Sequence, residues 1–128
     1  MPGVIKFSGP KQLSTLLKYE VASKYCREGA TVAPPVADLK LEIGDLLALV
    51  NKKAVPLNLD GSDGSETLWG ICLVNAQVLS GQTGVRVPAL TDGPAIIDST
   101  EIVWPAGADD AAKKVLREAM QGKGIKLI

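Results

Sequence analysis

Two cysteines are the first residues of this chain to consider for nucleophilic or metal chemistry. Cys26 and Cys72 lie far apart, neither belongs to a CxxC pair, and the chain contains no histidine. Histidine-based activation of a nucleophile and histidine-containing zinc sites are therefore excluded. Cys72 lies in the apolar stretch WGICLV, where a free cysteine is commonly a small core residue. We expect two free thiols, with Cys72 buried and Cys26 the more accessible.

Carboxylates are the other groups that could bind an ion or transfer a proton. The stretch DGSDGSE at residues 60–66 is rich in glycine and aspartate, but its acids do not follow the ligand register of an EF-hand. Catalysis by paired carboxylates needs two acids that converge in a cleft, which spacing in a sequence does not show. We therefore predict a structural turn here, with no metal site, no catalytic residues and no enzymatic activity.

Two adjacent lysines suggest a different chemistry. Lys52 and Lys53 follow the apolar run at residues 46–50 and precede a second strand-like segment, which places them at the exposed tip of a hairpin. A lysine at such a tip could carry a covalently attached cofactor. A small β-domain that acts as a binding or carrier module with a modified lysine is therefore the alternative function, and it predicts an added mass on Lys52 or Lys53.

Composition and charge restrict the class of protein. The 128 residues are 46% hydrophobic, with 13 glycines and 8 prolines, which favours one β-rich globular body with many turns. The net charge is zero, but residues 1–28 carry five basic against two acidic residues. This is not the concentrated basic surface of a general nucleic-acid-binding protein, and it allows the front of the chain to dock on an acidic protein. No stretch has the length of a membrane span or the apolar core of a signal peptide, so we expect a soluble protein made in the cytoplasm.

The elements that would position these residues fall into two parts. Residues 1–35 have a mixed pattern and end in the stiff stretch TVAPP, which is typical of an extended arm that orders on a partner. Residues 36–128 are expected to form the body and to contain every strand. In the body, DLKLEIGDLLALV predicts a hairpin of two paired strands joined by a turn at Gly44 and Asp45, and further short apolar segments alternate with polar turns. The pattern predicts a mainly β body.

The C-terminal segment departs from this pattern. Asp109 or Asp110 can cap a helix at its N-terminus. The helix that follows has apolar residues at helical spacing, which predicts a buried face made of Ala112, Val115, Leu116, Ala119 and Met120. The final IKLI alternates as a short strand with one buried face would.

Taken in order, several segments resemble the lambda-type bacteriophage head decoration proteins. They are YE, YCRE and TVA in the front part, LEIGDLLAL, DGSDGSETLWGICL, and the closing EIVWPAGADDAAKKVLREAMQGKGIKLI. The resemblance implies a compact β-clip or β-tulip-like body with one short C-terminal helix and an extended N-terminal arm. It also implies a homotrimer without enzymatic activity or cofactor, which cements the major capsid protein at local threefold axes of the expanded head against the pressure of packaged DNA. The protein would lie on the outer surface of the virion after synthesis in the host bacterial cytoplasm, with no direct contact to nucleic acid or membrane.

The same resemblance implies that the front of the chain binds the capsid. Tyr19, Val21 and Tyr25 alternate as the anchors of an added strand would. Nearby lysine and arginine side chains would steer the approach to an acidic partner. The expected capsid-binding residues are Lys18, Tyr19, Glu20, Val21, Lys24, Tyr25 and Arg27.

Overall fold

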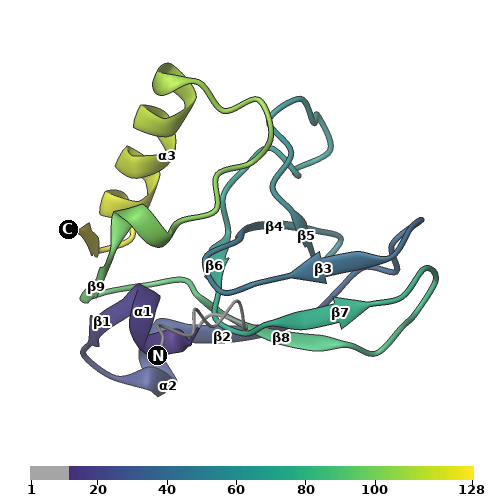
Figure 1. Cartoon of the computed structure of the whole chain (residues 1–128), viewed down its shortest axis with the longest axis horizontal. Coiled ribbons are helices and arrows are strands. Elements are labelled where there is room, and N and C mark those ends of the chain that lie inside the picture. Colours follow the sequence, from purple (N-terminus) through teal and green to yellow (C-terminus); the bar gives the residue numbers. More distant parts are fainter. Residues whose placement is uncertain (1–11) are drawn as a thin grey trace, which may run out of the picture.

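The computed structural model describes residues 12–128, which form ten short strands in three sheets, one helix of 13 residues and three single-turn helices (Figure 1). Strand accounts for 35% and helix for 21%, so the prediction of a mainly β protein with one short C-terminal helix is confirmed. The strands are β1 (Leu17–Glu20), β2 (Arg27–Thr31), β3 (Leu39–Leu41), β4 (Leu46–Val50), β5 (Lys53–Pro56), β6 (Gly70–Cys72), β7 (Ala76–Val78), β8 (Arg86–Leu90), β9 (Ala95–Ile97) and β10 (Ile125–Leu127). The helices are α1 (Leu13–Leu16), α2 (Ser23–Cys26), η1 (Ser99–Glu101) and α3 (Asp110–Gly122).

The largest sheet is antiparallel, has the order β2-β8-β6-β4-β5, and closes on itself. Closure occurs where the chain leaves β2: Val32 forms a parallel bridge with Ala54, and the Ala33 N–H donates a hydrogen bond of 2.9 Å to the Ala54 carbonyl. This contact covers part of the edge of β5 at the point of closure. Both faces of this sheet carry buried side chains: in β4, Leu46 belongs to one core cluster and Leu47 to the other.

The second sheet joins the beginning and the end of the described chain. β9 pairs with β1 in antiparallel and with β10 in parallel orientation. Gly93, just before β9, packs so closely on Gly124, just before β10, that a Cβ atom on Gly93 would lie 1.8 Å from the Gly124 carbonyl oxygen. Only glycine permits this approach of the two backbones.

The local predictions for the body are largely confirmed. β4 and β5 pair around an exposed turn in which Asn51 and Lys52 have φ angles of 52° and 65°, as a two-residue hairpin turn of the primed type requires. Asp109 caps α3, because its carboxylate accepts a hydrogen bond of 2.8 Å from the Ala112 N–H. The closing IKLI contains strand β10, whose first residue Ile125 is buried.

Two predictions about strand arrangement are wrong. The two segments on either side of Gly44 do not pair with each other: β3 pairs with β7, and β4 with β5 and β6. The turn is diverted because the Gly44 N–H donates to the Cys72 carbonyl (3.0 Å) and the Asp45 carboxylate accepts the Glu42 N–H (2.7 Å), so the chain enters a different sheet.

The expectation that all strands follow residue 36 also fails. β1 and β2 precede this point, and each pairs along its length with a strand from the second half of the chain. The physical reason is burial: Leu16 and Cys26 are completely inaccessible and belong to the main core cluster. The remainder of the predicted arm, residues 1–11, lies outside the described residues.

The predicted buried face of α3 is too wide. Leu116 and Met120 are buried, whereas Val115 is 65% exposed. The helix packs on one side only, and the residue next to Leu116 in sequence is turned about 100° away from that contact.

Candidate functional site

An exposed ridge runs over β1 and α2, and it is made of lysine, tyrosine and valine side chains. Tyr19, Val21 and Tyr25 expose 50%, 51% and 67% of their surface. Lys18 and Lys24, their neighbours in the sequence, are also exposed, and the Lys18 Nζ donates a hydrogen bond of 2.9 Å to the Ser14 carbonyl. We call these five residues the β1–α2 ridge. A group of large apolar side chains of this kind, bordered by polar ones, is typical of a surface that binds another protein.

Two buried residues hold the backbone of the ridge against the core. α1 and α2 are each four residues long, and the last residue of each, Leu16 and Cys26, is fully buried. The backbone is fixed as well: the Val21 N–H donates to the Pro94 carbonyl (2.9 Å), and the Cys26 carbonyl accepts the Thr91 N–H (2.9 Å). The ridge is therefore presented on a fixed support that belongs to the core.

The other two predicted capsid-binding residues, Glu20 and Arg27, bind each other instead of joining the ridge. The Arg27 Nε donates to one carboxylate oxygen of Glu20 at 3.0 Å, and Nη2 donates to the other. The hydrogen bond to Glu20 is the main reason that the pKa of Arg27 is raised. The two side chains are only 14% (Glu20) and 31% (Arg27) exposed, so their first role is to tie β1 to β2.

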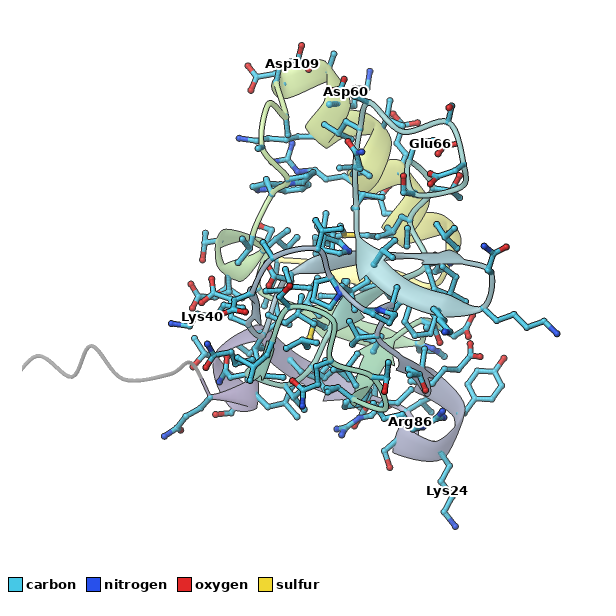
Figure 2. All side chains as sticks on the ribbon, turned by 90° about the vertical axis from the view of Figure 1, so that its right-hand side faces the viewer. Lys24, Lys40, Asp60, Glu66, Arg86 and Asp109 are labelled. Atoms are coloured by element: carbon cyan, nitrogen blue, oxygen red, sulfur yellow. The ribbon has the colours of Figure 1, made fainter. Side chains whose placement is uncertain are left out.

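Charged side chains lie at both ends of the molecule. Figure 2 shows Lys24 extending away from the ribbon at one end, with Arg86 near it, while Asp60, Glu66 and Asp109 lie at the opposite end. That opposite end also carries Lys113, Lys114 and Arg117 of α3, so its charges are mixed. Lys24 and Arg86 place basic side chains at the end that carries the ridge.

A comparison with family models decides which kind of protein carries this surface. The model described as bacteriophage lambda head decoration protein D matches residues 7–125 of the 128-residue chain. The chain belongs to this family. Its role is that of a structural decoration protein of the phage head, and the resemblance seen in the sequence is confirmed. A search of curated proteins found no match.

The acidic turn at residues 60–66 is a structural turn of this decoration protein, as predicted. The Asp63 carboxylate accepts hydrogen bonds from the Ser65 hydroxyl (2.6 Å) and the Ser65 N–H (3.1 Å), and these bonds lower the pKa of Asp63. The Glu66 carboxylate accepts the Gly64 N–H. Over residues 12–128, no group of three potential ligands is arranged to hold a metal ion, and no helix is long and apolar enough to cross a membrane.

The prediction that Cys26 is the more accessible thiol is wrong. Both cysteines are free and have no exposed surface. Cys26 is buried because it ends α2 and fills the core, where its Sγ lies 3.8 Å from the Pro94 carbonyl. Cys72 is buried as predicted, and this burial raises the pKa of its thiol. Lys52 and Lys53, the basis of the carrier alternative, are exposed on the β4–β5 hairpin.

Sequence reasoning missed a second exposed apolar site, at the end of the β3–β7 ribbon. Val36 is 100% exposed and Leu79 is 51% exposed. The available signal was the isolated valine directly after Pro34 and Pro35. The sequence predicts a linker up to Pro35 and the start of the body at Val36, whereas the structure places Val36 on the surface at the end of the β3–β7 ribbon.

Proposed function

We propose that this protein decorates the outer surface of the expanded phage head as a homotrimer, binds at local threefold axes, and stabilises the head against the pressure of packaged DNA. Family membership supports the structural role on the head. The observation that supports a contact with the capsid is the β1–α2 ridge, which presents exposed aromatic and aliphatic side chains on a buried support. In this proposal the protein has no enzymatic activity and no cofactor, and it contacts neither nucleic acid nor membrane.

The partner of the ridge in this proposal is the major capsid protein. Residues 1–35 are the capsid-binding segment, and the five residues of the ridge belong to it. β1 is an edge strand of its sheet, with β9 on one side only, so an extended capsid segment can pair with its other side. Tyr19 and Val21 then supply side-chain anchors, while Glu20 and Arg27 act by holding β1 in place.

Charge and valency support the same arrangement. Lys18 and Lys24 place positive charge beside the apolar anchors, which favours approach to an acidic capsid surface and makes binding weaken as salt rises. In a trimer three ridges face the capsid together. Their combined binding exceeds that of a single ridge by a large factor, because the second and third contacts form at high effective concentration.

The test is co-sedimentation of the full chain with undecorated expanded heads. Tyr19→Ala/Tyr25→Ala should weaken binding at least tenfold, mainly through faster dissociation. The matched control is Val115→Ala, which removes an exposed apolar side chain on α3 instead. If the tyrosine variant pellets as well as the control, the ridge is not the capsid anchor. Failure of the unmodified protein to pellet would reject decoration itself, and sedimentation of the free protein tests the trimer.

A further inference from the structure

The end of the β3–β7 ribbon is an apolar tip that is held in a fixed position. The loops that join β2 to β3 and β7 to β8 lie together at the right-hand end of Figure 1, away from α3. The Gly81 N–H donates to the Pro35 carbonyl (2.8 Å), and the Ser80 hydroxyl donates to the Val36 carbonyl (2.9 Å). Because Pro34 and Pro35 also restrict the backbone, the fully exposed Val36 is presented with little conformational freedom. We call Pro34, Pro35, Val36 and Leu79 the apolar tip.

An apolar groove lies elsewhere on the same molecule, where β3 and β4 approach the chain segment before α3. Its volume is about 360 Å³, and its apolar lining includes Leu46, Pro56, Leu57, Val103, Trp104 and Pro105. Lys113 and Arg117 of α3 place their charged groups 5.8 Å and 5.2 Å from the centre of the Trp104 ring. Grooves with an aromatic wall are suited to stiff, extended segments that contain proline, because such segments lose little entropy on binding.

We propose that the apolar tip of one copy inserts into the Trp104 groove of the next copy. This inference rests on the trimer of the proposed function. A ring of three identical chains needs two different complementary patches on each chain, because the contact between neighbours is heterologous. The tip is an apolar protrusion and the groove is an apolar concavity of suitable size.

Charge around the two patches is complementary. The tip carries Asp38, whose carboxylate accepts the Ser80 N–H at 2.8 Å. The groove has Lys40 on its wall, and Lys113 and Arg117 lie beside Trp104. Asp45, whose carboxylate accepts the Glu42 N–H, adds one negative charge to the groove wall, against the three positive charges of Lys40, Lys113 and Arg117. Insertion therefore brings an acidic tip to a groove with a basic border, which favours this pairing over one between two tips.

Engineered cysteines test the contact directly, since both native thiols are buried. Val36→Cys/Ala106→Cys places one thiol on the tip and one on an exposed residue of the groove. On mild oxidation we expect covalent dimers and trimers on a non-reducing gel. The control Val36→Cys/Val115→Cys has its second thiol on the exposed side of α3 and should remain unlinked. Equal cross-linking of the two variants would overturn the proposal.

A charge substitution gives the second test, and it distinguishes failure of the tip contact from failure of the proposed trimer. Val36→Asp should raise the protein concentration at which trimers dissociate at least tenfold. Val115→Asp, at a mostly exposed position on α3, should leave that concentration unchanged. Both positions are exposed, so both variants should fold. If the unmodified protein is trimeric and Val36→Asp leaves it so, the tip contact is rejected and the proposed function stands. If the unmodified protein is monomeric at high concentration, the proposed trimer fails and the tip contact with it.

Discussion

Arg27 of β2 and Glu20 of β1 form a bidentate ion pair that links the first strands of two different sheets. Arg27→Ala leaves the mostly buried Glu20 carboxylate without its partner, so we expect the free energy of unfolding to fall by about 1–3 kcal/mol. Urea denaturation measures this change. Lys24→Ala, which removes an exposed positive charge three residues earlier, is the control and should shift stability by less than about 0.5 kcal/mol. Equal effects would mean that the pair is not structural.

Removal of residues 1–33 should prevent folding of the remaining chain. The deletion takes away β1 and β2 together with the buried Leu16 and Cys26. It also opens the closed sheet at β8 and uncovers one side of β9. Circular dichroism and amide exchange would detect the loss. A cooperative thermal transition in the truncated protein would show instead that the part from residue 36 onward is an independent body.

Two neighbouring residues of α3 should respond differently to the same substitution. Leu116→Ala should lower the free energy of unfolding by about 2–5 kcal/mol, because it leaves a cavity in the core. Val115→Ala should change it by less than about 0.5 kcal/mol, since this side chain is mostly exposed. Denaturant midpoints of the two variants provide the comparison. A larger loss for Val115→Ala would place the wrong face of the helix against the core.

Neither native thiol should react with a thiol reagent while the protein is folded. Cys26 and Cys72 have no exposed surface, and burial raises the pKa of Cys72, so little reactive thiolate forms at neutral pH. Both should react at once in guanidinium chloride. Mass spectrometry after labelling distinguishes the two positions. Rapid modification of Cys26 alone under native conditions would show that β1 and α2 open independently of the rest of the protein.

Asp98 should make part of the stability dependent on pH. Its carboxylate accepts hydrogen bonds from the Thr100 hydroxyl (2.7 Å) and the Thr100 N–H (3.0 Å), which hold the pKa of Asp98 below its ordinary value of 3.8. A lowered pKa means that this contribution is present above about pH 4 and is lost as pH falls through the folded-state value. Thr100→Val should therefore raise the pKa of Asp98.

NMR titration of the Asp98 carboxyl measures that shift. The variant Thr83→Val in the exposed β7–β8 loop is the control and should leave the titration unchanged. An unaltered Asp98 titration in Thr100→Val would show that the backbone N–H alone sets the value.

Local features of the sequence determined several elements of this protein. The carboxylate of Asp109 and the spacing of Leu116 and Met120 define α3, because helix capping and helical periodicity act within a few residues. The Asn51–Lys52 turn is equally local, since the polar residues between two apolar runs leave little choice but a hairpin. The ordered segments were also sufficient to indicate the family to which the chain belongs.

Tertiary structure alone decided how these elements combine. The alternation around Tyr19 predicts a strand but not its partner, because strands that pair with β9 and strands that pair with a capsid have the same period of two. The predictions that Cys26 is accessible and that Val115 is buried are wrong for a similar reason. Whether a side chain is buried depends on which distant segments of the chain pack against it. Glu20 and Arg27 lie seven residues apart in the sequence, and they meet only because β1 and β2 join different sheets and leave the two side chains facing each other.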